Sequence, residues 1–306
     1  MKGAALPIAI FVVLALFPLL PLGGMETFLL ALVARVMIFA IAAVSLDLIL
    51  GGGGLVSFGH AAFIGIGAYA VAILDANGII DATVVVPAAL AGGGLFALAT
   101  GAVSLRTRGV YFIMITLAFA QMAFFVAGSL AQYGGDDGYT LYDRTELAGL
   151  RPLAGPLGLY WSSFAMLLGA YLLCRMLLAS RFGRVLRAAK ENRTRVEALG
   201  FAPFRFQLAA HVIAGMIAAL SGVLLANSAE FVSPAYASWQ RSGELLVMVI
   251  LGGAGTLHGA ILGAAFVLLA EEYLSHLTEH WRLIFGPMLV LAVLFFRRGL
   301  AGVLRG

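Results

Sequence analysis

Residues 27–50 read TFLLALVARVMIFAIAAVSLDLIL and lead directly into the glycine cluster Gly51–Gly54. About 20 consecutive apolar residues are enough for a helix to cross the hydrocarbon core of a bilayer. Arg35 and Asp47 are the only ionisable residues in this stretch. The stretch therefore predicts a membrane-spanning helix that ends at a run of glycines.

The composition of the whole chain supports this interpretation. Of 306 residues, 62% are hydrophobic and only 11% are charged, whereas soluble domains carry roughly 25% charged residues. So few charges cannot cover a water-exposed surface, which argues against a soluble enzyme, a nucleic-acid-binding protein or a disordered chain. The excess of arginine is typical of cytoplasmic loops. The single cysteine, Cys174, allows no intrachain disulfide, and no metal site is predicted.

We predict an all-α fold, a polytopic transmembrane helical bundle that forms a single domain over residues 1–306. Apolar runs give about ten spans, including a pair broken by the glycines at 252–255. The first run resembles a signal peptide, but we expect it to be retained because a second apolar run follows at once. The predicted spans are 5–22, 27–50, 57–74, 83–103, 110–131, 160–179, 206–227, the broken pair in 244–274, and 283–296.

The loops between these spans alternate in charge. Loop 104–109, segment 180–205 and the tail with Arg297, Arg298 and Arg305 are basic, whereas turn 75–81, loop 132–159 and segment 271–282 are acidic. Basic loops face the cytoplasm, so both termini are expected there and 132–159 is expected to face outward. The alternation holds only if 244–274 crosses an even number of times.

The glycine cluster has an internal echo. Ile49–Gly54 (ILGGGG) recurs as Ile250–Gly255 (ILGGAG), which is explained by duplication or by chance in a glycine-rich chain. Glycine permits a broken helix whose backbone lines a path, and it also lets helices pack closely. Both roles stay open for the candidate pathway glycines, which are Gly51, Gly52, Gly54, Gly252, Gly253 and Gly255.

Polar residues inside spans are further pathway candidates, because such groups usually face an interior or a cavity. Asp47, Ser57, His60 and Gln121 belong to this set, and Glu244 is a weaker member. Ser57 and His60 are three residues apart and are expected to share a helix face. A membrane Ser–His hydrolase is the enzymatic alternative, although the pattern Gly-x-Ser-x-Gly is absent. A hydrogen-bonded structural histidine is the simpler interpretation.

Segment 180–200 predicts a basic amphipathic helix. Arg181, Arg184, Arg187 and Lys190 repeat every three residues along one side, and an apolar strip of Phe182, Val185, Leu186 and Ala189 lies beside them. Gly200 is a natural helix stop. Such a helix lies on anionic lipid, forms a solvated loop, or docks into a groove on a partner, and the residues alone do not separate these readings.

Several motifs together resemble a known family. Ser180–Gly200 resembles the cytoplasmic coupling loop of permease subunits of ATP-driven (ABC) importers. The patterns Gly51-x-x-Gly54-Leu55-x-Ser57-x-Gly59-His60 and Gly252-Gly253-x-Gly255-Thr256-x-x-Gly259 resemble the branched-chain amino acid permease family. Gly134-Gly135-x-Asp137-Gly138 resembles the outward loop of its M-type subunit. The resemblance covers about residues 28–300, and Asp47 departs from it, because a neutral residue such as Asn is expected there.

The resemblance implies half of an importer in a bacterial-type inner membrane. A sister permease subunit would complete the path, two cytoplasmic ATPase subunits would bind ATP and Mg²⁺, and an extracytoplasmic solute-binding protein would deliver the solute. The chain itself would hold no cofactor and is not an enzyme, and neither Lys2 nor Lys190 belongs to a phosphate-binding P-loop. The ATPase-coupling residues implied within loop 180–204 are Arg181, Phe182, Gly183, Arg184, Arg187, Lys190, Asn192, Leu199 and Gly200.

The solute stays open at this stage. The family resemblance points to branched-chain or other hydrophobic amino acids, while related permeases are expected to carry urea, short amides or aromatic acids. A stand-alone channel or secondary transporter is the alternative from another class, in which 180–200 would lie on lipid.

Overall fold

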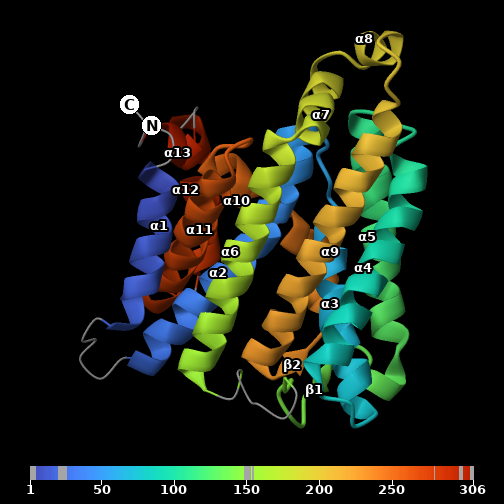
Figure 1. Cartoon of the computed structure of the whole chain (residues 1–306). Coiled ribbons are helices and arrows are strands. Elements are labelled where there is room, and N and C mark those ends of the chain that lie inside the picture. The colour runs from blue at the N-terminus through green and yellow to red at the C-terminus, as the bar shows by residue number, and fades with distance from the viewer. Residues whose placement is uncertain are drawn as a thin grey trace.

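The computed structural model describes residues 5–19, 26–147, 153, 155–278, 280–295 and 299–303. These residues form a helical bundle, as the sequence predicts (Figure 1). The α-helices are α1 (Ala5–Leu16), α2 (Glu26–Gly53), α3 (His60–Ala76), α4 (Ala82–Ser104), α5 (Val110–Ser129), α6 (Pro156–Ala179), α7 (Arg181–Glu191), α8 (Arg193–Ala198), α9 (Pro203–Ala229), α10 (Trp239–Gly252), α11 (Leu257–Leu277), α12 (Trp281–Phe295) and α13 (Gly299–Val303). Shorter elements are η1 (Phe17–Leu19), η2 (Ala131–Tyr133), η3 (Pro234–Ala237), β1 (Tyr139–Thr140) and β2 (Phe231–Val232).

Six of the described helices are long and apolar enough to cross a membrane: α2, α4, α5, α6, α9 and α11. Residues 5–19 and α3 are apolar but shorter. The predicted break in 244–274 is present between Gly252 and Leu257, but α10 has only 14 residues, which is about 21 Å of helix. Since a bilayer core is about 30 Å thick, α10 does not cross alone, and the count of ten spans is not confirmed.

Helix α2 is the centre of the bundle. It packs against α6, α9, α10 and α11, and its residues from Val36 to Ile49 are buried. A second group is formed by α3, α4 and α9. There an added Cβ at Gly67 would meet the carbonyl oxygen of Ala219, and one at Gly222 would meet that of Ile64. Small residues thus set the close approach of α3 and α9, as is usual between membrane helices.

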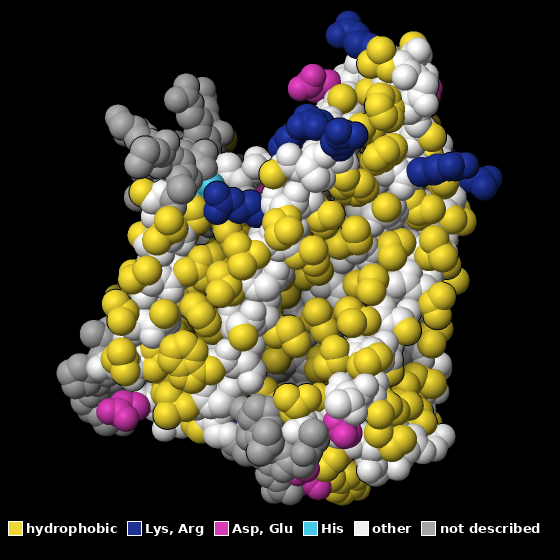
Figure 2. Space-filling view, viewed as in Figure 1, with side chains coloured by type: hydrophobic (Ala, Val, Ile, Leu, Met, Phe, Trp, Pro, Cys, Tyr) yellow, Lys and Arg dark blue, Asp and Glu magenta, His cyan; other side chains and the backbone are white. Residues whose placement is uncertain are grey.

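The two ends of the bundle differ in charge. Helices α7 and α8 stand at one end, which we call the α7 end, and β1 and β2 lie at the other, which we call the β end (Figure 1). On the face shown in Figure 2, Lys and Arg gather at the α7 end, where acidic side chains also lie among them, whereas only Asp and Glu are seen among the described charged residues at the β end, and the band between the two ends is apolar. The tail residues Arg297, Arg298 and Arg305 lie outside the described residues.

Loop 132–159, of which the structure describes all but 148–152 and 154, lies at the β end. Its strand β1 pairs antiparallel with β2, with Tyr139 opposite Val232. Tyr139 donates its hydroxyl to Asp75 (3.1 Å), and burial followed by this hydrogen bond raises the pKa of Tyr139 to about 12. Arg144 forms an ion pair with Glu230 (2.5 Å). These contacts tie the loop to the ends of α3 and α9.

Two sequence predictions are wrong in detail. The helix predicted through 180–200 is broken at Asn192, because the Asn192 side chain accepts a hydrogen bond from the Arg195 N–H (2.9 Å) and starts α8. Ser57 and His60 do not share a helix face, because residues 54–59 are not helical and α3 begins only at His60. The glycines before Ser57, with Gly54 at φ +69°, end α2 and allow the chain to turn.

Candidate functional site

Helix α7 is docked on the bundle by its apolar strip. Ser180 begins it by accepting a hydrogen bond from the Phe182 N–H (3.2 Å), and Gly183, Leu186 and Ala189 are buried. An added Cβ at Gly183 would meet the backbone of Leu178 at the end of α6. Phe182 packs against Phe206 of α9, with ring centroids 5.7 Å apart. The helix is therefore held between α6 and α9 rather than lying free.

The opposite side of α7 is basic and open. Arg181, Arg184 and Arg187 are exposed, and the Arg187 guanidinium donates to the Leu178 carbonyl (3.0 Å). After the break at Asn192, α8 ends at Ala198, Leu199 is 70% exposed, and Gly200 takes a left-handed conformation at φ +84°. The predicted coupling residues other than Phe182 and Gly183, which pack against the bundle, thus lie on one projection with a basic surface.

Lys190 is exposed like the three arginines, but it contacts the end of the central helix α2. Its ammonium donates to the Gly51 carbonyl at the end of α2 (3.0 Å), and its methylene stem lies over Gly54, where an added Cβ would come within 2.8 Å of Cγ. A side chain at Gly54 would crowd this contact. The basic helix and the first glycine cluster are therefore in direct contact.

The second glycine cluster meets the first at the same place. The Gly255 N–H donates to Asp47 Oδ1 (2.6 Å), and an added Cβ at Gly51 would collide with the Gly255 backbone. We call this set, Asp47, Gly51, Gly54, Lys190 and Gly255, the glycine junction. The two stretches that echo one another in sequence are thus packed together at the α7 end.

The remaining predicted glycines also make close packing contacts. Gly52 lies against Leu178 and Leu186, Gly252 lies against the Gly259 backbone, and Gly253 lies against Gly299. For Gly52 and Gly252, where an added Cβ would meet these neighbours, the close approach of other segments accounts for glycine. A role for these residues in a solute path stays a prediction.

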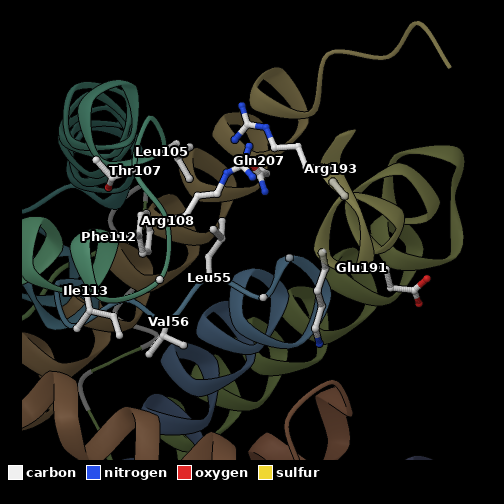
Figure 3. A pocket seen from close by; sticks show the side chains of 15 residues that line it. Leu55, Val56, Leu105, Thr107, Arg108, Phe112, Ile113, Glu191, Arg193 and Gln207 are labelled. Carbon is white, nitrogen blue, oxygen red and sulfur yellow. The ribbon is translucent and has the colours of Figure 1, made fainter. Parts of the chain in front are cut away.

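A cavity of about 290 Å³ opens beside the junction (Figure 3). It is lined by the end of α2, the turn between α4 and α5, and residues of α7 and α9, among them Leu55, Arg108, Lys190 and Gln207. Two guanidinium groups, of Arg108 and Arg193, and the amide of Gln207 give it a polar side. This cavity lies between the α7 projection and the turn between α4 and α5.

Ser57 and His60 have different hydrogen-bond partners, and Gln121 lies on another helix. The His60 Nε2 bonds the Ser45 hydroxyl (2.8 Å), whereas Ser57 Oγ accepts from the Gly59 N–H (3.2 Å), so the two do not form a Ser–His pair. Gln121 is half-buried on α5. His60 therefore has the structural contact that its simpler interpretation predicts.

Sequence reasoning missed Ser45 and Ser242. Ser242 of α10 accepts a hydrogen bond from the Ala61 N–H at the start of α3 (3.0 Å), so the first turns of α3 and α10 meet inside the bundle. A small polar residue in an apolar run is a weak signal, and its partner 181 residues away cannot be identified from spacing alone.

Comparison with known proteins identifies relatives over most of the chain. The family model for the permease component of branched-chain amino acid transport systems matches residues 28–293. The high-affinity branched-chain amino acid transport system permease protein LivM of Escherichia coli (strain K12) is 27% identical over 296 residues, which covers 88% of this chain and 69% of that protein.

Two further relatives match shorter regions. The permease protein LivH of the same transport system in Escherichia coli (strain K12) is 31% identical over 127 residues, 40% of each chain. The autoinducer 2 import system permease protein LsrC of Klebsiella pneumoniae is 33% identical over 147 residues, 45% of this chain and 41% of that protein. No solved structure matches the chain.

The apolar helical bundle, the glycine-rich motifs and a family match that spans most of the sequence agree: the chain is a multi-pass membrane protein that belongs to the family of permease components of branched-chain amino acid transport systems.

Proposed function

We propose that this chain is the permease subunit of an ATP-binding-cassette importer and forms half of the path for branched-chain or other hydrophobic amino acids. The observation that carries the proposal is the α7 projection, whose basic face is open to a partner while Lys190 on the same helix bonds the end of the central helix α2. A helix that merely lay on lipid would not need this contact with the core.

The α7 end would face the cytoplasm. Basic residues gather there, as Figure 2 shows, and the positive-inside bias assigns such an end to the cytoplasm. Both termini would then be cytoplasmic, and the β end with loop 132–159 would face outward, where an extracytoplasmic solute-binding protein delivers the solute. A sister permease subunit would complete the path, as the separate LivM and LivH relatives suggest.

Two cytoplasmic ATPase subunits would supply the energy. They would bind ATP and Mg²⁺ and contact the open arginines of α7, and their closure would move α7. Because Lys190 bonds Gly51, movement of α7 would act directly on the glycine junction and on the end of α2. The permease itself would form and break no covalent bond.

In-cell crosslinking tests the partnership. Ala188 is exposed on α7, so a photoreactive crosslinker on Ala188→Cys should capture an ATPase subunit, identified by mass spectrometry. Leu95→Cys on the exposed apolar surface of α4 (68% exposed) is the matched control and should capture lipid only. Capture of lipid alone at both positions would refute the proposal, as would downhill L-leucine flux through the purified chain alone, which would indicate a stand-alone channel or secondary transporter.

Uptake measurements identify the solute. Vesicles that contain the complete importer should accumulate L-leucine only with ATP. The LsrC relatives make autoinducer 2 the second candidate solute, and urea, short amides and aromatic acids complete the set to be compared. Accumulation of one of these in place of L-leucine would keep the importer and change the solute.

A further inference from the structure

A second cavity, of about 370 Å³, lies away from the glycine junction, toward the β end. It is formed by the first half of α2, the end of α9, η3, the first turn of α10 and the last turns of α11. Its lining is mostly apolar and includes Phe39, Ser228 and Tyr236, with charged groups from Arg35, Arg241 and Glu272. A mostly apolar pocket with a few placed polar groups is the usual form of a small-molecule site.

The two arginines come from different helices and meet at this cavity. The Arg241 guanidinium carbon lies 5.1 Å from the centre of the Phe39 ring, and Phe39 is one helical turn after Arg35 on α2. Both guanidinium groups line the same cavity as Tyr236. The cavity wall therefore carries two guanidinium groups beside two aromatic rings, with the carboxylate of Glu272 also in the lining.

The depth of these charges makes them unusual. Arg35 is nine residues from the start of α2, about 14 Å along the helix, and its side chain is 38% exposed. An arginine at such depth is costly and normally faces an interior or a water-filled space rather than lipid. The charged cavity therefore marks a part of the bundle that meets water or a partner.

The binding capacity of Arg35 is not used up inside the chain. Within the described residues its nearest acid, Glu271, stands at 3.8 Å, beyond hydrogen-bond distance, while a guanidinium has five N–H donors in a planar fork. Arg241 bonds Glu244 through one nitrogen (2.6 Å). Donors remain on both groups, and a carboxylate is the anion whose two oxygens fit such a fork.

We propose that this cavity binds the carboxylate of the transported solute, with Arg35 and Arg241 as binding residues and Phe39 and Tyr236 beside its apolar part. The ligand class is a small carboxylate on an aliphatic body, which includes the branched-chain amino acids. This assignment rests on the proposed transport function. It places the first contact of the solute in the outward half of the bundle, before the glycine junction.

Labelling of a cysteine in the cavity tests the assignment. The Ser228→Cys variant of the full chain is prepared in native membranes from cells that also express its proposed partner subunits. The rate at which this cysteine reacts with a water-soluble maleimide is then measured. Cys174 is fully buried, so the unsubstituted chain gives the background. Isovalerate or L-leucine at ten times its dissociation constant should slow labelling about tenfold, whereas isoamylamine, which has no carboxylate, should not.

Variants of the two arginines test whether Arg35 and Arg241 bind the carboxylate. Arg35→Gln and Arg241→Gln should each weaken protection by isovalerate by about ten- to a hundredfold, the value of a hydrogen bond to a charged group. Arg175→Gln, an exposed arginine on α6, is the matched control and should leave protection unchanged. Leu199→Cys at the α7 end should be labelled equally with and without ligand. If Ser228→Cys misfolds, the change in tryptophan fluorescence on adding isovalerate to the purified unsubstituted chain replaces the labelling readout.

Specific results would overturn the proposal. Protection by isoamylamine equal to that by isovalerate, no protection by any carboxylate, or protection that survives both arginine variants would each reject the site. Protection of Ser228→Cys by phosphatidylglycerol alone, in detergent solution, would assign the cavity to a lipid headgroup. ATP-dependent L-leucine uptake without protection of Ser228→Cys would reject the site and leave the transport function standing. Protection without such uptake would support the site and reject the transport function.

Discussion

Asp47 shows how one residue connects distant parts of the chain. It is fully buried in α2 and accepts a hydrogen bond from the Gly255 N–H, while its second carboxylate oxygen has no partner among the described residues. Its helix neighbour Gly51 bonds Lys190. A carboxylate here, where the family resemblance leads one to expect Asn, keeps a negative group close to the Lys190 ammonium.

Two replacements of Asp47 distinguish the effect of its hydrogen-bond acceptor from the effect of its negative charge. Asp47→Leu removes the acceptor for the Gly255 N–H and should destabilise the chain by about 1–2 kcal/mol. Asp47→Asn keeps an acceptor oxygen and should be close to the unsubstituted chain. Thermal unfolding in detergent measures both, and equal losses for the two variants would show that the negative charge, not the hydrogen bond, is what stabilises the junction.

At the scale of one element, the position of helix α7 on the bundle depends on one glycine, Gly183. Gly183 lies directly against the Leu178 backbone, so α6 and α7 can meet only if this residue is glycine. Leu186 and Ala189 then complete the buried side, and the arginines are turned outward. The whole basic face is therefore positioned by one close backbone contact.

Gly183→Ala should push α7 away from α6. Overpacking of this kind costs about 1–3 kcal/mol, so α7 should open more often and trypsin should cut after Arg184 and Arg187 faster. Gly169→Ala on α6, where an added Cβ has nothing within 4 Å, is the control and should leave the cleavage rate unchanged. Slow cleavage of both variants would mean that Leu178 moves aside at little cost.

Over the whole molecule, the distribution of apolar and charged surface defines how the bundle sits. Helices α4, α5 and α6 expose large apolar side chains such as Leu95, Met122 and Met176, while α2 and α9 are mostly buried. An apolar outer band between a basic and an acidic end is what a bilayer requires.

A charge placed on that band should impair insertion. Leu95→Arg, on a side chain 68% exposed in the middle of α4, should cost about 2.5–3.5 kcal/mol of insertion free energy and lower the amount of chain recovered in membranes. Leu199→Arg, on a side chain 70% exposed at the α7 end, should have no effect. Equal recovery of the two variants would show that α4 is covered by protein rather than lipid.

The sequence predicted the features that depend only on residues close together along the chain. Long apolar runs located α2, α4, α5, α9 and α11 to within a few residues, because a helix in lipid must satisfy its own backbone. The spacing of Arg181, Arg184 and Arg187 located the open side of α7. These features need only the length and periodicity of one segment.

Features that join distant segments could not be predicted. The contact of Gly51 with Gly255, the bond of His60 to Ser45 in place of Ser57, and the meeting of Arg35 with Arg241 all depend on how helices pack against one another. Many helix rotations bury similar apolar surface, so spacing within one helix does not determine its partner. The charged cavity toward the β end was therefore not predictable, although Arg35 was noted as an ionisable residue within a span.

The hydrogen bond between Asp47 and Gly255 also has a consequence for biosynthesis. The two residues are 208 positions apart, so the ribosome delivers the acidic side chain to the bilayer long before its donor exists. Until Gly255 has been synthesised, the first helices form an incomplete bundle in which the Asp47 carboxyl group must be protonated or shielded by the insertion machinery. A ribosome that stalls before codon 255 would leave a nascent polypeptide that membrane quality-control proteases can recognise by this unpaired acid.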